Sequence, residues 1–350
     1  MPLHSHALIT LLAALLACAN ATAAPASREL QAQCWRAEDL TALPDERLVQ
    51  KIPQSRPPVL GHYEASPQPG QITGAVRRVD LPRGKKLIAL TLDFCEQPGE
   101  ISGYDGAVID YLRQNRIKAT LFAGGKWMAT HVARTQQLMS DPLFEIASHG
   151  LAHRNTRLLT GTDLTREILG PSYVYQVARS TLARAQCAAP HATAIASIPP
   201  KLNLFRFPFG ACNAEGLAAA AASGLTAIQW DVSTGDPSPL QSAAAIATSM
   251  ITNIRPGSII IAHANGRGHN TAAALPLAIP KLRAMGYTFV TVGELMAAGT
   301  PVISGTCYDS RPGDTDKYDT LFQKPAMPIA RSPLPGVPPD ARSSLGSLPR

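Results

Sequence analysis

The chain has 350 residues, with 32 lysines and arginines against 25 aspartates and glutamates, so its formal net charge is +7. Because 45% of the residues are hydrophobic and only 16% are charged, the composition excludes a wholly disordered, collagen-like or coiled-coil chain. No block of lysines and arginines stands out, so the positive charge does not favour a nucleic-acid partner. This length predicts one large domain with appendages, or two domains.

Residues 1–24 are predicted to be a signal peptide. They contain no Asp, Glu, Lys or Arg, and their apolar stretch from Ala7 to Ala19 is too short to cross a bilayer as a helix. Small residues typical of a cleavage site follow it up to Ala24. We therefore expect a secreted or periplasmic protein without a transmembrane span, or one with a lipid anchor at Cys18.

Two segments flanking the core differ from it in composition. Residues 25–80 are predicted to be an N-terminal extension and linker, because 51–70 are rich in proline and glycine. Beyond residue 300 the periodic pattern fades, and residues 301–350 are predicted to be a Pro-rich, disordered tail.

Between these segments, short apolar runs typical of β-strands alternate with longer segments of helical periodicity. The runs are KLIALTLDF, ATLFAGG, FEIASHG, NLFRFPFG, LTAIQWDV, SIIIAHA and YTFVTV. The helical segments are residues 103–117, 128–140, 162–185, 214–223, 240–253 and 274–285. This alternation predicts parallel strands joined by right-handed crossovers, in either a barrel or a doubly wound sheet.

Polar side chains follow five of these runs, where a barrel of this kind would carry its chemistry. They are Asp93, the pair His149 and His153, Arg206, Asp236 and His263. An HxxxH spacing can place two imidazoles on one metal ion, although alone it is more often a chance match. Together, the five strand ends supply the residue types needed for metal-assisted hydrolysis.

The motifs TLDFCE, SHGLAH, RFPFGACN, STGDP and IAH, in this order, resemble the five motifs of the polysaccharide deacetylases, a family that acts on chitin, peptidoglycan and nodulation factors. The resemblance covers about residues 85–295 and implies that residues 81–300 are a catalytic domain. The implied α/β fold is a distorted, incomplete (β/α) barrel of about seven parallel strands, with irregular N- and C-terminal extensions. The implied activity is removal of acetyl groups from an N-acetylated or O-acetylated glycan by an exported hydrolase with a divalent metal ion, expected to be zinc.

The resemblance also implies roles for individual residues. Asp93 matches the general base and Arg206 the arginine that orients it, while His263 matches the general acid and Asp236 the carboxylate that tunes it. His149 and His153 match the metal-binding histidines, and the backbone at Phe209 falls where the family stabilises the oxyanion. Trp230 is a candidate for stacking on a sugar ring, with buried packing as the alternative.

Three positions depart from the family pattern. Phe94 replaces the metal-binding aspartate, Ser233 the first aspartate of the fourth motif, and Pro237 its tryptophan. We expect Glu96 to be the third metal ligand, since it is the nearby carboxylate with sufficient reach, and Asp231 to be a partner for Arg206.

Two alternatives to the deacetylase hypothesis stay open. The first is an amidase of the same fold that acts on another C–N bond. The second is a glycan-binding pseudoenzyme that lacks a metal.

After loss of the signal peptide, an odd number of cysteines would remain, so one thiol would be unpaired. They are Cys34, Cys95, Cys187, Cys212 and Cys307. A Cys34–Cys307 disulfide could join the two extensions, but the sequence does not fix the pairing. A buried, unpaired thiol is an equally good interpretation of Cys187.

Overall fold

The structure is a computed structural model that describes residues 26–65, 67 and 71–321. Residues 26–34 are helical. The later α-helices are α2 (Gly106–Gln114), α3 (Gly125–Thr130), α4 (Val132–Met139), α5 (Gly161–Ala183), α6 (Ala192–Ser197), α7 (Ala214–Ala222), α8 (Ala243–Thr252), α9 (Thr271–Ala284), α10 (Val292–Ala297) and α11 (Lys317–Leu321). Four 3₁₀ turns are η1 (Ala37–Leu40), η2 (Thr156–Leu158), η3 (Gln186–Ala188) and η4 (Pro208–Gly210).

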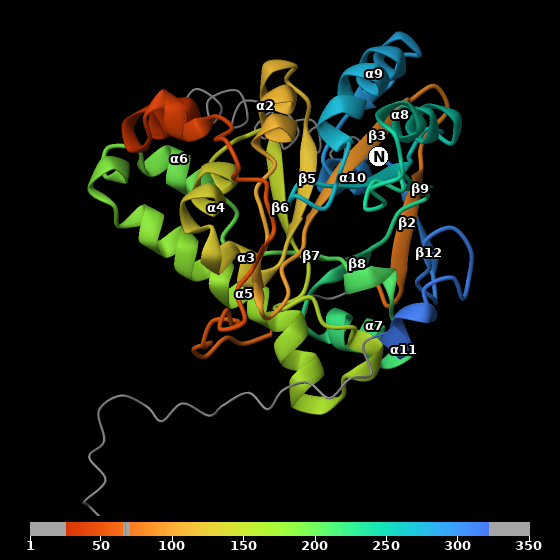
Figure 1. Cartoon of the computed structure of the whole chain (residues 1–350), viewed down its shortest axis with the longest axis horizontal. Helices are drawn as coiled ribbons and strands as arrows, with labels where there is room; N and C mark the ends of the chain where they lie inside the picture. The colour runs from red at the N-terminus through yellow and green to blue at the C-terminus, as the bar shows by residue number, and fades with distance from the viewer. Residues whose placement is uncertain (1–25, 66, 68–70, 322–350) are drawn as a thin grey trace, which may run out of the picture.

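The strands form one large curled sheet and one small ribbon (Figure 1). The large sheet contains β2 (Ala75–Asp80), β3 (Leu87–Phe94), β5 (Ala119–Ala123), β6 (Phe144–Ser148), β7 (Leu204–Phe205), β8 (Thr226–Ile228), β9 (Val232–Ser233), β10 (Ile259–His263), β11 (Thr288–Phe289) and β12 (Thr300–Ser304). Its order is β12-β2-β8-β7-β6-β5-β3-β10-β9, with β11 beside β3. Every pairing in it is parallel except that of β12 with β2. Strands β1 (Gln50–Lys51) and β4 (Glu100–Ile101) form the separate antiparallel ribbon.

The sheet curls because a single run of the chain contributes to both of its ends. Strand β8 pairs with β2 and β7, whereas β9, three residues later, pairs with β10. Between them, the Gln229 N–H donates to Val76 O and the Asp231 N–H donates to Ile259 O. The run LTAIQWDV is therefore not one strand, as its apolar pattern predicted, but two short strands that bring the ends of an incomplete barrel together.

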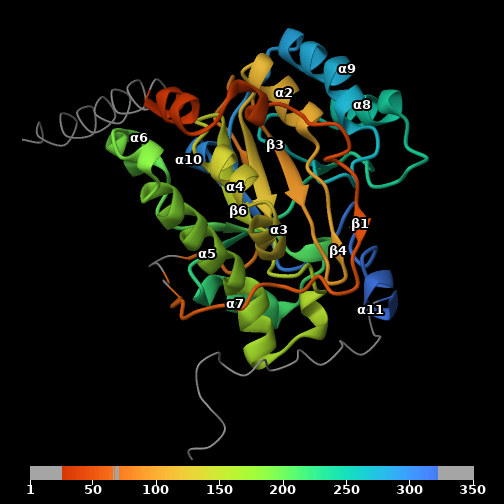
Figure 2. The ribbon, with the colours of Figure 1, turned by 60° about the vertical axis from the view of Figure 1, so that its left-hand side comes forward.

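Strand β3 shows how the two faces of the sheet are used. Its even-numbered residues, including Phe94, pack in the large outer cluster beneath the helices, while Ala89 belongs to an inner cluster. This is the alternation expected of a strand, and it directs Thr91 and Asp93 inward. Figures 1 and 2 show the helices arranged around the outside of the curled sheet. Phe94 is fully buried there, with its ring centroid 4.5 Å from that of Trp127 in α3.

Helix α10 fills the barrel at the N-terminal ends of the strands. Val292 and Leu295 of this helix belong to the inner cluster with Ala89. The Val292 N–H donates to Thr120 Oγ1 at 2.8 Å, at the beginning of β5. With this end packed, the C-terminal ends of the strands form the accessible end of the barrel.

The seven predicted strand runs and the six predicted helical segments all contain elements of the predicted type, and the expected fold class is confirmed. Segment 128–140 is divided between α3 and α4. Strands β2 and β12 lie in segments predicted to be linker and tail, and the described structure continues to residue 321. The predicted signal peptide, including Cys18, and residues 322–350 lie outside the described residues. No helix among the described residues has the length and hydrophobicity to span a membrane.

Two disulfides connect the core to its flanking segments. Cys34 is bonded to Cys187, and Cys212 is bonded to Cys307. The suggested Cys34–Cys307 pairing is thus wrong, as is the interpretation of Cys187 as an unpaired thiol. Cys95 is the free cysteine of the described chain, and it is buried.

Candidate active site

A cavity of about 480 Å³ lies at the C-terminal ends of the strands. Seven of the predicted site residues line it: Asp93, His149, His153, Phe209, Trp230, Asp236 and His263. Ser233 and Pro237, two departures from the family pattern, also line it. The parallel topology thus brings together side chains that are up to 170 positions apart in the sequence, because the carboxyl ends of all these strands meet at one edge.

Asp93, at the end of β3, is held by the buried guanidinium of Arg206. Arg206 Nη1 donates to Asp93 Oδ1 at 2.7 Å and to Thr91 Oγ1 at 2.8 Å. Its other nitrogens donate to backbone carbonyls, and the guanidinium lies 3.9 Å from the ring centroid of Phe122. Burial lowers the pKa of Arg206, while the Asp93 carboxylate opposes this effect. Arg206 therefore fixes the orientation of Asp93 from inside the barrel without lining the cavity itself.

Asp231 does not have the predicted role of partner to Arg206. It pairs instead with Arg255, at 3.1 Å, and accepts hydrogen bonds from Ser258 Oγ and the Ile259 N–H. Asp231 thus connects β9 to the start of β10, and this prediction was wrong because the carboxylate is occupied there.

His149 follows β6 and presents one ring nitrogen to the cavity. Its Nδ1 lies 2.9 Å from the carbonyl oxygen of Arg206. Because a carbonyl only accepts hydrogen bonds, Nδ1 carries a proton, so Nε2 is the nitrogen that could bind a metal when the ring is neutral. This Nε2 lies 3.5 Å from Asp93 Oδ2.

His153 is placed by an unusual turn. Its backbone is left-handed, with φ of 52°, as is that of Gly150, with φ of 75°. Glu167 of α5, a residue that the sequence analysis missed, holds this turn by accepting the N–H groups of Ala152 and Arg154, each at 3.0 Å. Nδ1 of His153 is buried and has no hydrogen-bond partner among the described residues. A buried nitrogen in this state is a candidate ligand atom.

A third donor joins the two histidines, and it is Cys95. Ligand atoms of Cys95, His149 and His153 all lie within 4.8 Å of one another, so these three residues could hold a metal ion. Burial alone would raise the pKa of the Cys95 thiol, but His153 and His149 lower it well below its usual range. Thiolate and imidazole are both ligand types that zinc binds, and three protein ligands leave the fourth position open, so the residues present fit the expected metal.

Glu96, the ligand predicted from the sequence, is engaged elsewhere. Its Oε1 accepts a hydrogen bond from Lys126 Nζ at 2.5 Å, and its Oε2 accepts from the N–H and the hydroxyl of Ser102. Both partners of the Glu96–Lys126 ion pair are fully buried. The structure therefore replaces Glu96 with Cys95 in the candidate ligand set, because strand alternation directs residues 93 and 95 to the cavity and turns residue 94 away.

His263 and Asp236 form a second polar pair in the cavity wall. His263, the last residue of β10, lies beside Asp93 in the register of β3 and β10. Its Nδ1 lies 2.9 Å from Asp236 Oδ1, while Asp236 Oδ2 accepts from the His263 N–H and from Thr271 Oγ1. Burial alone would lower the pKa of His263, but the Asp236 carboxylate outweighs it and the pKa lies well above its usual value. The raised pKa favours the protonated imidazole and makes His263 a potential proton donor.

Phe209 and Trp230 form aromatic parts of the cavity wall. Phe209, in the 3₁₀ turn η4, has a left-handed backbone with φ of 61°, a conformation that turns it out of the regular path of the chain. Its ring centroid lies 4.3 Å from that of His153. Trp230 is largely buried, and its Nε1 donates to Asp309 Oδ1 at 2.9 Å.

Comparisons with known proteins identify the core. Residues 80–228 match the family model described as polysaccharide deacetylase. This match identifies a polysaccharide deacetylase domain in this part of the chain. The chain is 26% identical over 221 residues to a peptidoglycan-N-acetylglucosamine deacetylase of Bacillus cereus, an alignment that covers 62% of this chain and 91% of the relative. It is 27% identical over 225 residues to a chitooligosaccharide deacetylase of Bradyrhizobium sp., covering 61% and 91%.

Two solved structures show the same fold as the deacetylase domain. The Bc1960 peptidoglycan N-acetylglucosamine deacetylase superposes with a TM-score of 0.51 at 22% identity, covering 65% of this chain and 94% of that one. A CE4 family pseudoenzyme from Bacillus anthracis superposes with a TM-score of 0.52 at 19% identity, covering 64% and 69%. At these identities the likeness establishes the fold alone. A peptidoglycan deacetylase of Listeria monocytogenes is longer, and the alignment covers 42% of it.

Proposed function

We propose that this chain is an exported, metal-dependent hydrolase that removes acetyl groups from an N-acetylated glycan. The observation that carries the proposal is the meeting of two polar pairs, Asp93 with Arg206 and His263 with Asp236, at one cavity. Hydrolysis of an amide needs a group that accepts a proton from water and a group that donates one to the departing amine. The Asp93–Arg206 pair supplies the proton acceptor, and the His263–Asp236 pair supplies the proton donor.

Cys95, His149 and His153 would hold the metal ion beside Asp93. A divalent metal bound there supplies Lewis-acid activation of water and of the acetyl carbonyl group. The Nδ1–H of His149 bonded to the Arg206 carbonyl keeps the ring in the tautomer that leaves Nε2 for the ligand role. Arg206 therefore supports both the carboxylate and one imidazole.

Asp93 is the proposed general base. Its Oδ1 is occupied by Arg206, and its Oδ2 lies on the side of His149, where it can accept a proton from the attacking water. The fixed guanidinium keeps the carboxylate oriented, which is what a base requires before substrate arrives.

His263 is the proposed general acid, and Phe209 the proposed oxyanion donor. As the C–N bond breaks, the protonated imidazole of His263 donates its proton to the sugar nitrogen, and acetate and a free amine are the products. Asp236 accepts a hydrogen bond from Nδ1, which leaves Nε2 as the donating nitrogen. The left-handed turn at Phe209 supports a role for its N–H in stabilising the tetrahedral oxyanion.

The glycan substrate is supported by the relatives and by the cavity wall. The relatives named above are deacetylases of peptidoglycan and of chitooligosaccharides. Trp230 lines the cavity, and an aromatic side chain in a cavity wall can pack against a sugar ring. An O-acetylated sugar is the alternative substrate, because an ester needs less assistance to its leaving group than an amide does.

Export is supported by the two disulfides, which form and persist in oxidising compartments. This agrees with the signal peptide predicted for residues 1–24. A periplasmic or extracellular location would also bring the enzyme to cell-wall or environmental glycans.

The proposal is tested by measuring acetate release and metal content together. The purified chain should release acetate from chitopentaose or peptidoglycan, and His149→Ala or His153→Ala should lower bound metal and acetate release in parallel while the circular dichroism spectrum is retained. Cleavage of another C–N bond instead of acetyl release would favour the amidase alternative. Glycan binding with neither metal nor turnover would favour a pseudoenzyme.

A further inference from the structure

The C-terminal segment 305–321, here called the strap, lies beyond the residues that match the family model and yet forms part of the cavity. It follows β12 and ends in α11 (Figure 1). Five of its residues line the cavity: Asp309, Asp314, Thr315, Lys317 and Tyr318. A substrate in the cavity would therefore touch a segment for which the family motifs assign no role.

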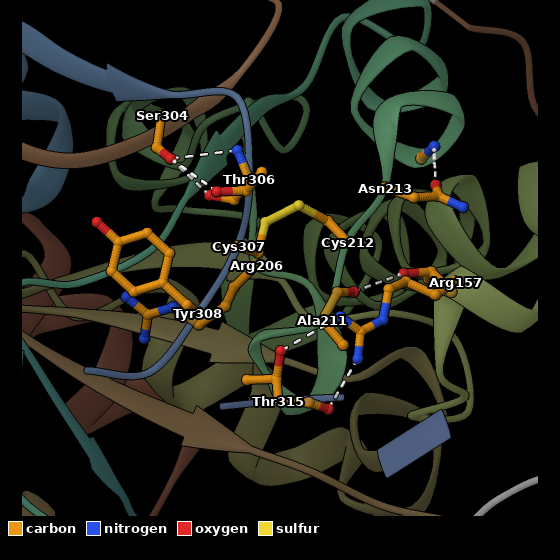
Figure 3. The surroundings of a disulfide bond; sticks show 12 residues. Arg157, Arg206, Ala211, Cys212, Asn213, Ser304, Thr306, Cys307, Tyr308 and Thr315 are labelled. Carbon is orange, nitrogen blue, oxygen red and sulfur yellow. Dashed lines mark hydrogen bonds between the residues drawn. A yellow bond between two sulfur atoms is a disulfide. The ribbon is translucent and has the colours of Figure 1, made fainter. Parts of the chain in front are cut away.

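The first attachment of the strap is covalent. The Cys212–Cys307 disulfide joins it to the turn that follows Phe209, as Figure 3 shows. Cys212 is three positions from Phe209, the proposed oxyanion donor. The strap is thus tied directly to a catalytic motif of the barrel.

Arg157, in η2, provides the second attachment. Its Nη2 donates to Thr315 O at 2.7 Å, a bond visible in Figure 3, and its Nε donates to Asp319 Oδ1 at 3.0 Å. Asn155 Nδ2 donates to the same Asp319 oxygen at 2.7 Å. These bonds hold the strap on either side of Lys317 and Tyr318.

Arg77 of β2 holds the other end of the strap. Its guanidinium donates to Tyr308 O at 2.6 Å and to Asp309 O at 2.9 Å, and it lies 3.6 Å from the ring centroid of Tyr308. Asp314 then closes the intervening turn by accepting the N–H groups of Asp309, Ser310 and Arg311. A segment fixed at so many points is a formed wall of the cavity in this structure.

The strap extends the aromatic surface of the cavity away from the histidines. The ring of Tyr318 lies 5.2 Å from that of Phe209, centroid to centroid, and Phe209 in turn contacts His153. On another side, Asp309 accepts the Trp230 Nε1–H and so fixes the indole. The result is an apolar surface with polar edges, beginning at the proposed catalytic centre and continuing onto the strap.

We propose that the strap is a sugar-binding subsite, with Tyr318 as the platform for the ring next to the acetylated residue of a β-linked N-acetylglucosamine oligomer. The inference rests on the proposed function for the choice of glycan. A sugar ring has an apolar face that packs on an aromatic ring and hydroxyl edges that need polar partners. Tyr318 supplies the ring, and Lys317 and Asp309 supply polar groups in the same wall.

The test is direct binding of chitopentaose, measured by calorimetry in an Asp93→Asn background that cannot turn it over. Tyr318→Ala should raise the Kd about 5- to 10-fold, the size of effect expected for one aromatic contact. Tyr318→Phe, which keeps the ring, should bind close to the parent affinity. Leu321→Ala is the matched control, because Leu321 is an exposed residue of the same helix that does not line the cavity.

The subsite is overturned if Tyr318→Ala binds chitopentaose as tightly as Leu321→Ala does, or if the parent does not bind it. Acetate release by the unmutated chain tests the proposed function separately. If the unmutated chain releases acetate but Tyr318→Ala does not weaken chitopentaose binding, the proposed function stands and the proposed subsite is wrong. If Tyr318→Ala weakens chitopentaose binding but the unmutated chain releases no acetate, the proposed subsite stands and the proposed function is wrong.

Discussion

Asp93 and Arg206 form a buried ion pair in which the proposed base and its orienting group are inseparable. Asp93→Asn removes the base, and turnover should fall on the order of 10²-fold or more. The amide also leaves the buried guanidinium without its counter-ion, so the free energy of unfolding should fall by about 3–5 kcal/mol. Kinetics and denaturant unfolding of the variant measure these two effects. Near-normal turnover would remove Asp93 from the mechanism.

The raised pKa of His263 predicts the direction of a pH effect. A general acid must be protonated, so activity should decline as pH rises through the pKa of His263, which Asp236 holds above its usual value. Asp236→Asn removes the carboxylate, lowers this pKa, and should move the decline to lower pH. The pH profile of kcat/KM for the two proteins checks this shift. An unchanged alkaline limb would contradict the assignment of His263 as the acid.

Cys95 and Glu96 can be separated by metal titration. Cys95→Ser should weaken metal affinity by about 100-fold or more, since it replaces a thiolate ligand, and metal should protect the thiol of the unmutated protein from alkylation. Glu96→Gln should leave metal affinity unchanged but lower the free energy of unfolding by about 3–5 kcal/mol, because it strands the buried ammonium of Lys126. If Glu96→Gln weakened metal affinity and Cys95→Ser did not, Glu96 rather than Cys95 would be the ligand.

The candidate site could be predicted from the sequence wherever one motif ends one strand. Asp93, His149, His153, Arg206 and His263 are of this kind, and the fold places all five at the same end of the barrel. Cys95 could not be chosen over Glu96, because the choice depends on which side of the strand end each side chain takes and on the distant Lys126. The signal that was available is the period of two, which puts residue 95 on the same face as residue 93.

At the scale of the secondary-structure elements, the sequence-based predictions failed for strands that are short or carry charged residues. Strand β2 was assigned to a linker because Arg77 and Arg78 interrupt its apolar pattern. In the structure, Arg77 is occupied by the strap, a contact 231 positions away that no local pattern contains. Strand β12 was assigned to the tail for a similar reason, since it is a partly exposed edge strand.

The strap provides a prediction at this scale. The Cys212–Cys307 disulfide closes a loop of 95 positions, and its removal in Cys307→Ser should lower the free energy of unfolding by about 2–5 kcal/mol. Because the strap lines the cavity, the KM for chitopentaose should also rise. Urea unfolding and steady-state kinetics measure both quantities, with the Leu321→Ala variant as control. A variant with unchanged stability and KM would show that the other attachments suffice.

At the scale of the whole molecule, the domain that matches the family model is flanked by segments outside that match. The barrel follows from the alternation of strands and helices, which is why its class was predictable. The flanking segments are attached by two disulfides and by Arg77 and Arg157, whose partners are far away in the sequence. Because these contacts are made with distant parts of the barrel, the local composition of the flanking segments predicted only a linker and a tail.

The central claim is that this cavity hydrolyses the acetyl group of an N-acetylated glycan with Asp93 as base and His263 as acid. The most direct measurement is the simultaneous release of acetate and free amine from chitopentaose, compared among the unmutated chain, Asp93→Asn and His263→Ala. We predict equal amounts of the two products from the unmutated chain and losses of about 100-fold or more in both variants. No acetate from the unmutated, metal-supplied chain, or undiminished release by either variant, would contradict the account.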